Sequence, residues 1–464
     1  MTTAATTSPA GSFRREGLLT LRLALPLVVG NLAQAAINTT DVLILGRYDV
    51  DALAAAALGV NLYWVFGVFC MGLVTATSPL IAAEYGARSN SVRDIRRTVR
   101  QAIWASAAIC IPVWAILWHA EAIYLLLGQS PDLSEAAGRF VRIAMWGLFP
   151  WLVGLVLRYF VTALERPMWG VYVMMAGLAF NALACWVLVF GAFGLPELGL
   201  EGAAIANALA QTVLGIGGVL VVTGVRRFRR YRLFGNFWRP DWQRFRAIFS
   251  VGLPIAMTYA MEITVFSAAV FLMGLIGRAS LAAHSVAIQI AALAFMVPLS
   301  IGQAATVRAG IFHGRADSIG LSRTGKVALA LGLASAALSS LLMWLIPEEL
   351  VGLFVRPVTA EDAEVFRLAV AFLGVAAVFQ LVDSLQAVGA GLLRGIQDTR
   401  VPMLFAGLGY WVIGFTLGWY LAFHTDLAGV GVWIGLAGGL AATAVLMCGR
   451  WLMRGRLGLA PTAP

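Results

Sequence analysis

The sequence predicts an all-α polytopic membrane protein with twelve transmembrane helices, in two six-helix bundles related by a pseudo-two-fold axis along the membrane normal. Three observations predict this fold class: the composition, the length of the apolar runs and an internal repeat. Of the 464 residues, 60% are hydrophobic and only 12% are charged, whereas soluble domains carry roughly 25% charged residues. This composition excludes an ordinary water-soluble fold.

Twelve apolar runs are each long enough to cross a bilayer, which takes about 20 helical residues. Short polar, arginine-bearing or Gly/Pro-bearing connections separate them. The residues before the first run show no signal-peptide pattern, so we expect this run to stay as a helix of the protein. We expect spans at residues 18–46, 53–84, 99–127, 137–162, 168–191, 199–223, 247–277, 281–310, 325–347, 365–391, 401–423 and 428–453.

The positive charges follow the predicted topology. The net charge is +10, and arginines follow every even-numbered span, with the largest group in residues 224–246. The connections after spans 3, 5 and 9 are acidic instead. By the positive-inside rule, both termini are expected in the cytoplasm. The net positive charge is then explained by membrane orientation and by contact with anionic lipid. We therefore expect no nucleic-acid binding.

An internal repeat relates the two halves at an offset of 228 residues without gaps. Two bundles are therefore expected at residues 18–223 and 247–453, joined by a basic cytoplasmic linker at 224–246, with cytoplasmic tails at 1–17 and 454–464. Parallel repeats of this kind are typical of transporters that work by alternating access. The offset aligns Leu25-Pro26 with Leu253-Pro254, Gly46 with Gly274, Leu53-Ala54-Ala55 with Leu281-Ala282-Ala283, and Gly86 with Gly314.

Three carboxylates, Asp41, Glu262 and Asp383, lie well inside predicted spans. A charge at the bilayer centre costs at least about 2.5–3.5 kcal/mol, so such residues usually face an internal cavity and carry function. Each has polar companions on its own helical face. These are Gln34 and Asn38 for Asp41, Thr258 and Tyr259 for Glu262, and Gln380 and Ser384 for Asp383.

We interpret the three acids as a cation-coupling and substrate site. A carboxylate in an apolar medium can take up a proton or a monovalent cation in competition with a cationic substrate. Aromatic residues nearby, such as Phe266 and Phe379, would suit flat organic cations. The alternative is a set of buried acids that only fix helix packing. His284 is a candidate for a proton relay, although a histidine at a helix end is more often simply hydrogen-bonded.

The chain resembles the multidrug and toxic compound extrusion (MATE) transporters, and within them the NorM-like branch. The resemblance covers essentially the whole chain. Its motifs are Pro26 with Thr40-Asp41 and Gly46, the stretch Leu281-Ala282-Ala283-His284-Ser285-Val286-Ala287, the loop Leu393-Arg394-Gly395-Ile396-Gln397-Asp398-Thr399-Arg400 with Pro402, and Gly429-Val430-Gly431-Val432-Trp433-Ile434-Gly435.

The resemblance implies an inner-membrane antiporter, not an enzyme, that exports small organic cations in exchange for Na⁺ or H⁺ and needs no other cofactor. We expect it to act as a monomer. Asp41 matches the family's first-helix acid. Glu262 and Asp383 match the NorM-type cation pair, which makes these two residues the expected Na⁺ ligands. Sodium and protons both suit carboxylates, so the coupling ion stays open.

One position departs from the family pattern. The family often has an aspartate four residues after the asparagine that matches Asn181, and here this residue is Cys185. An amino-terminal ion site would then keep only Asp41 and Asn181. All four cysteines, Cys70, Cys110, Cys185 and Cys448, fall in predicted spans without metal-ligand spacing, so we interpret them as small core residues.

Two other functions are considered. A flippase for lipid-linked precursors, from the same superfamily, would need a cationic cavity for pyrophosphate, yet the interior charges are acidic. A membrane-embedded enzyme would need a catalytic cluster, and the four histidines, His119, His284, His313 and His424, are scattered without an HExxH or GxSxG motif. Both are less favoured than the antiporter.

Overall fold

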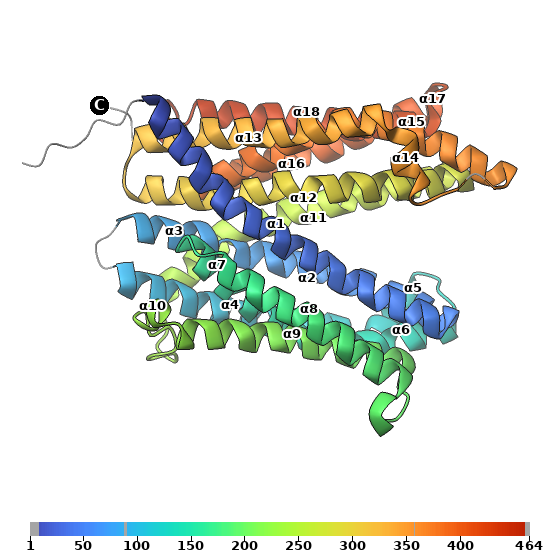
Figure 1. Ribbon diagram of the computed structural model, residues 1–464, viewed down its shortest axis with the longest axis horizontal. Helices are drawn as coiled ribbons and strands as arrows, with labels where there is room; N and C mark the ends of the chain where they lie inside the picture. Colours follow the sequence, from blue (N-terminus) through green and yellow to red (C-terminus); the bar gives the residue numbers. More distant parts are fainter. Residues whose placement is uncertain (1–8, 88–90, 357, 460–464) are drawn as a thin grey trace, which may run out of the picture. The chain divides into compact units, whose positions relative to one another are not determined.

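The computed structural model describes residues 9–87, 91–356 and 358–459, and all regular elements in this part are helical (Figure 1). Residues 1–8 and 460–464 of the predicted tails lie outside it. The helices are α1 (Pro9–Tyr48), α2 (Val50–Thr75), α3 (Thr77–Ala87), α4 (Ser91–Trp118), α5 (Ala120–Leu126), α6 (Pro131–Ala144), η1 (Met145–Gly147), α7 (Leu148–Ala163), α8 (Met168–Phe190), η2 (Ala192–Gly194), α9 (Gly199–Gly224), α10 (Arg226–Arg229), α11 (Trp242–Ile276), α12 (Arg278–Gly314), α13 (Ser318–Leu345), α14 (Pro347–Gly352), α15 (Ala360–Gly395), α16 (Arg400–Gly407), η3 (Leu408–Phe415), α17 (Thr416–His424) and α18 (Ala428–Leu452).

Twelve helical stretches of the described chain are long and apolar enough to cross a membrane, which confirms the predicted number. The third is shorter than predicted, because it ends at Trp118 rather than at residue 127. The apolar sequence continues through the turn at His119 into α5, so hydropathy alone does not reveal the break. A tertiary contact fixes α5 instead, since the hydroxyl of Tyr124 donates to the carbonyl of Leu58 in α2 (3.1 Å).

The chain forms two compact units. The first unit comprises residues up to Val28 and from Thr258 onward, and the second comprises Val29–Met257. Both α1 and α11 therefore contribute to both units, and each changes unit shortly after an internal proline, Pro26 or Pro254. The bundle ranges 18–223 and 247–453 remain a prediction about which helices act together.

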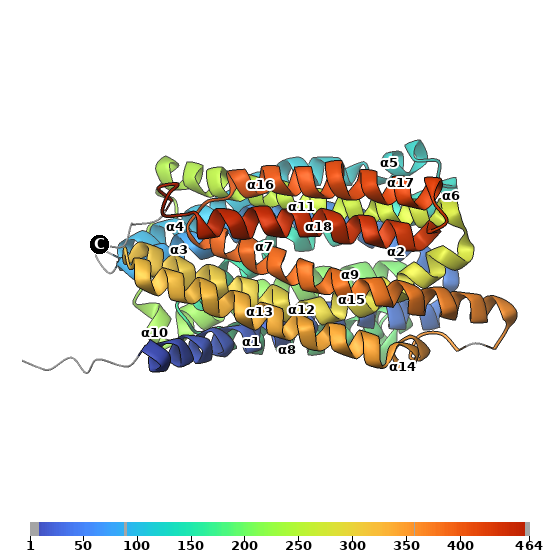
Figure 2. The same cartoon turned by 90° about the horizontal axis from the view of Figure 1, so that it is seen from above.

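In the first unit, α15 packs between α12, α13 and α18, and these long helices run alongside one another (Figure 2). Small residues allow α12 and α15 to approach closely, because a Cβ atom at Gly391 would collide with the backbone of Gly302. The hydroxyl of Thr306 donates to the carbonyl of Gly391 (2.8 Å) at the same crossing. Small residues and polar bonds of this kind drive helix association in membranes.

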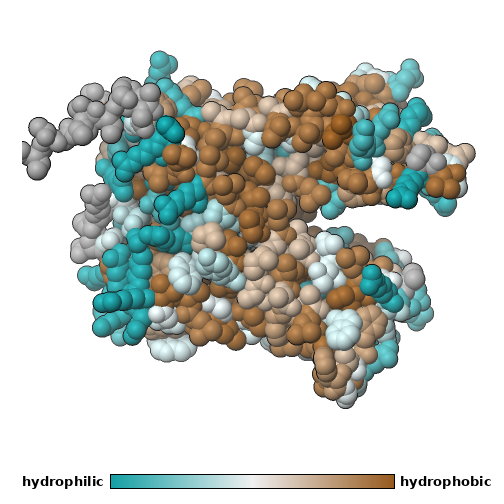
Figure 3. All heavy atoms as spheres, viewed as in Figure 1, coloured by the Kyte–Doolittle hydropathy of each residue, from teal (hydrophilic) through white to brown (hydrophobic). Residues whose placement is uncertain are grey.

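The second unit is built mainly on the contacts of α9 with α7 and α8, and of α2 with α6. Within each unit, hydrophobic residues cover the middle of the visible face and hydrophilic residues gather toward the helix ends (Figure 3). This banding is the pattern expected where a bilayer surrounds the middle of each helix.

A buried ion pair fixes the start of α1 in the first unit. The guanidinium of Arg308 in α12 donates to both carboxylate oxygens of Glu16, at 2.8 and 2.5 Å. The hydroxyl of Thr324 in α13 donates to the same carboxylate (2.9 Å). All three side chains are buried, so this cluster joins α1 to α12 and α13 and is shielded from solvent.

A second cluster fixes the start of α11 in the second unit. Arg244 pairs with Glu84 of α3 and with Asp94 of α4, the latter at 3.1 Å. The hydroxyl of Thr98 donates to Glu84 (2.7 Å). Arg244 follows Glu16 by the same 228 residues that relate the two halves. Each half thus has a carboxylate, arginine and threonine cluster at the start of its first long helix. The acid lies on α1 in one cluster, and the arginine lies on α11 in the other.

Candidate functional site

Asp41 lies in a hydrogen-bonded cluster within the second unit. The Nδ2 atom of Asn181 in α8 donates to its Oδ1 atom (2.7 Å), and the Nδ2 atom of Asn207 in α9 donates to its Oδ2 atom (3.3 Å). The side chain of Cys185, one turn after Asn181, lies close to this carboxylate. Two helices, α8 and α9, thus supply donors to one acid of α1.

The structure extends the set of Asp41 partners expected from the sequence. Asn181 is confirmed as a neighbour, and Cys185 fills the position of the family's aspartate as a neutral side chain. Asn207 is not singled out by the sequence, although an asparagine within the apolar run of α9 is a usable signal. Of the predicted companions, Gln34 and Asn38 are partly buried, and Nε2 of Gln34 has no hydrogen-bond partner in the described chain.

The two amide donors of Asp41 are expected to contribute unequally to stability. Asn181 is fully buried and makes the shorter bond, so Asn181→Ala should lower the free energy of unfolding by about 1.5–3 kcal/mol, as for hydrogen bonds to charged groups. Asn207→Ala should cost less, because its bond is longer and its side chain is partly exposed. Thermal unfolding in detergent measures both, and equal losses would contradict the assignment.

Glu262 and Asp383 both lie in the first unit, within electrostatic range of each other. They belong to α11 and α15, and Asp383 is 5% exposed. The charge of Arg394 also acts on Glu262. This arginine lies in the last turn of α15, the helix that also carries Asp383. The arginine side chain is long enough to extend from the end of α15 while its charged head bonds elsewhere.

Arg394 is held by a tyrosine one turn before Glu262. Its Nη1 atom donates to the hydroxyl of Tyr259 (3.0 Å), and its guanidinium carbon lies 4.9 Å from the centroid of that ring. Tyr259 was expected from the sequence as a companion of Glu262. The contact gives it a further role, since it positions a cation whose charge acts on Glu262.

Tyr410 and Gln386 complete this charged cluster. Nε2 of Gln386 is 2.8 Å from the hydroxyl of Tyr410, and the ring of Tyr410 is almost fully buried. Tyr410 interacts electrostatically with Glu262, Asp383 and Arg394. It lies in the π-helical segment η3, a distortion that often occurs at functional sites. No sequence pattern indicates either residue.

Several buried polar atoms near Asp383 have no hydrogen-bond partner within the described residues. They are both side-chain polar atoms of Gln380 and the hydroxyl of Ser384, which lie on the same helix as Asp383 and are fully buried. Buried polar groups are normally hydrogen-bonded. The atoms expected from the sequence as companions of Asp383 therefore offer free donors and acceptors to an ion, water or substrate.

His284 lies among aromatic rings. Its ring centroid is 5.4 Å from that of Trp433, which lies 5.6 Å from that of Phe379. Within the described chain, both ring nitrogens of His284 lack hydrogen-bond partners. Its role as a proton relay stays a prediction. Thr258 is buried, and the four cysteines are free thiols, three of them buried.

No group of three or more His, Cys, Asp or Glu residues suited to a metal ion occurs in the described part of the chain. A sodium ion at Glu262 and Asp383 would therefore need hydroxyl, amide or carbonyl oxygens as further ligands. Gln380 and Ser384 carry such oxygens on the same helix as Asp383. Sodium binding at the pair remains a prediction.

Twelve spans, paired units and intramembrane acids define a polytopic α-helical transporter fold. A eukaryotic MATE transporter, AtDTX14, has a TM-score of 0.81 at 21% identity, covering 94% of this chain and 95% of that one. A MATE structure in complex with MaD3S has a TM-score of 0.85 at 18% identity, covering 98% and 99%. These likenesses confirm the predicted fold class.

The family follows from sequence comparison. The MatE family model matches residues 26–187 and 254–420, one segment in each half. A "Probable multidrug resistance protein NorM" of Mesorhizobium japonicum is 49% identical over 450 residues, covering 97% of this chain and 96% of the relative. The same-named protein of Brucella suis is 48% identical over 446 residues, covering 96% and 95%. The chain belongs to the MatE family.

Proposed function

We propose that the protein is a secondary antiporter of the inner membrane, with both termini in the cytoplasm, that exports small organic cations in exchange for Na⁺ or H⁺. It acts as a monomer by alternating access. The observation that carries this proposal is the joint placement of Glu262, Asp383 and Arg394 next to the buried, unpartnered groups of Gln380 and Ser384. The names of the NorM relatives, as multidrug resistance proteins, support it.

The charges of the first unit suit one monovalent cation. Two carboxylates and one guanidinium leave a single net negative charge when both acids are ionised. One proton, one sodium ion or one organic monocation neutralises this charge, whereas two cations together would reverse it. Binding of the coupling ion and of the substrate is then mutually exclusive, which is the basis of exchange.

Neutralising the acids can drive the conformational change only if the bound cation has different affinities for the inward-facing and outward-facing states. A ligand shifts an equilibrium by its differential binding free energy and by nothing else. The state that keeps Glu262 and Asp383 close together is disfavoured while both are charged, and it becomes accessible once a cation binds. Asp41, in the second unit, acts as a separate titrating site with its own amide donors.

The experiment that tests this proposal measures the efflux of a fluorescent lipophilic cation from proteoliposomes. Sodium and proton gradients are imposed separately, in the wild type and in Glu262→Gln and Asp41→Asn. If only the sodium gradient drives efflux and Glu262→Gln stops it, the coupling ion is sodium at the paired acids. If only the proton gradient drives it and Asp41→Asn is the damaging change, the second unit carries the coupling. An efflux rate that is the same with and without either gradient would contradict antiport.

A further inference from the structure

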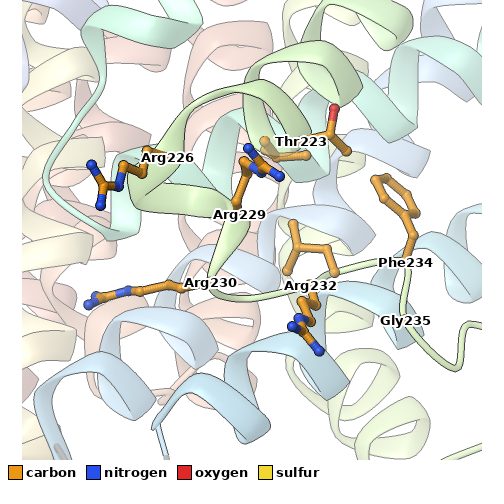
Figure 4. Close-up of a pocket in the computed structure, with 9 residues that line it drawn as sticks. Thr223, Arg226, Arg229, Arg230, Arg232, Phe234 and Gly235 are labelled. Carbon is orange, nitrogen blue, oxygen red and sulfur yellow. The ribbon is translucent and has the colours of Figure 1, made fainter.

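A cationic pocket follows the end of α9 in the second unit. We define it by Arg226, Arg229, Arg230 and Arg232, together with Thr223 and Phe234, and its volume is about 510 Å³ (Figure 4). Val222 and Leu233 line its apolar part. All four arginines are exposed, and none of them forms an ion pair with a carboxylate of the described chain. The pocket therefore combines uncompensated positive charge with an apolar wall.

The backbone that carries these arginines is fixed rather than a free linker. The rings of Phe228 and Tyr231 are buried and pack on Phe160 of α7, at centroid distances of 5.7 and 5.2 Å. At the other end of the segment, the guanidinium of Arg100 in α4 donates to the carbonyls of Gly235 (3.1 Å) and Asn236. The pocket arginines thus project from a preorganised frame.

The charge of the pocket selects an anion. Asp241 is the only acid of residues 224–246, and it is already bonded to Arg97 (2.5 Å). Guanidinium groups bind phosphate oxygens in a bidentate manner and are weakly hydrated. The guanidinium groups point in different directions (Figure 4), and that of Arg230 donates to the hydroxyl of Tyr231 (3.0 Å). The positive charge around the pocket still favours phosphate over a carboxylate, because phosphate offers more acceptor oxygens.

The surroundings favour a lipid as the source of this phosphate. The pocket begins at the end of the membrane-crossing helix α9, and Trp238 and Trp242 in the following segment are 81% and 59% exposed. Exposed tryptophans are enriched where a bilayer meets water, and basic pockets at the cytoplasmic ends of helices bind anionic headgroups. The exposed ring of Phe234 would contact the glycerol and first acyl carbons.

We propose that the cationic pocket is a binding site for the phosphate group of an anionic phospholipid. It lies outside both acidic clusters and is independent of the ion and substrate that the protein exchanges. A lipid held here would connect α9 to the segment leading into α11, and it would do so only in membranes that contain anionic lipid.

The test titrates the purified protein in detergent with phosphatidylglycerol, phosphatidylcholine or inorganic phosphate, and follows bound lipid by native mass spectrometry and stability by thermal unfolding. The double variant Arg226→Gln/Arg229→Gln removes two pocket charges. The matched control, Arg227→Gln/Arg239→Gln, removes two exposed arginines of the same segment that do not line the pocket. At roughly fivefold per arginine, the pocket variant should raise the half-saturating phosphatidylglycerol concentration about 25-fold.

The expected result is stabilisation by phosphatidylglycerol alone, at unchanged concentrations in the control and at about 25-fold higher concentrations in the pocket variant. Equal shifts in both variants would mean diffuse attraction to the basic segment and would overturn the site. Stabilisation by inorganic phosphate at concentrations that displace the lipid would assign a soluble anion instead. Equal binding of phosphatidylcholine would overturn the charge argument. Should the double variant fold poorly, Arg232→Gln is compared with Arg227→Gln, and the expected shift is about fivefold.

Discussion

Asp383→Asn is expected to abolish ion-driven efflux while the protein folds normally. Asparagine keeps the shape of the side chain but cannot carry the charge that a proton or sodium ion neutralises. Stability should not fall, since a neutral side chain at this buried position avoids the cost of placing a charge in an apolar medium. Transport in proteoliposomes should decrease to the level of protein-free liposomes, with wild-type thermal unfolding.

A matched control is Asp132→Asn, which removes an exposed carboxylate at the start of α6. This variant should transport like the wild type. Glu262→Gln should transport like Asp383→Asn. Either change leaves one carboxylate and one guanidinium, so the cluster no longer has a net negative charge to attract a cation. Normal gradient-driven export by both variants would rule out the paired acids as the coupling site.

The second large effect concerns stability. Arg308→Met leaves the carboxylate of Glu16 buried without its cation, and breaking a buried pair in this way typically costs about 3–5 kcal/mol. The double variant Glu16→Gln/Arg308→Met should recover most of the loss, because replacing both charges by neutral groups is often close to neutral. Thermal or denaturant unfolding in detergent measures the difference.

The comparison for this effect is an exposed pair. Arg142 and Glu121 are 3.2 Å apart, with side chains 34% and 38% exposed, so Arg142→Gln should change stability by about 0–1 kcal/mol. Arg308→Met and Arg142→Gln with the same unfolding midpoint would contradict the buried-pair argument. A large loss for Arg308→Met, rescued in the double variant, would show that the start of α1 is held to α12 and α13 by this ion pair.

The sequence alone determined the number of spans and the three intramembrane acids. Both are local properties, because a bilayer requires long apolar runs and makes an interrupting charge conspicuous. The end of the third span is predicted less accurately, because the apolar sequence continues through the turn at His119. The internal repeat can also be detected in the sequence. Its aligned prolines, Pro26 and Pro254, lie just before the points where α1 and α11 pass from one compact unit to the other.

Only the tertiary structure decided which residues meet these acids. Asn207 reaches Asp41 across helices that are far apart in sequence, and Tyr410 reaches the paired acids from a π-helical turn. Arg394 is predicted from sequence as a helix-end charge, yet its side chain contacts Tyr259 and acts on Glu262. Hydropathy fixes the depth of a helix in the membrane, but its rotation and neighbours depend on packing between small residues and on buried polar bonds.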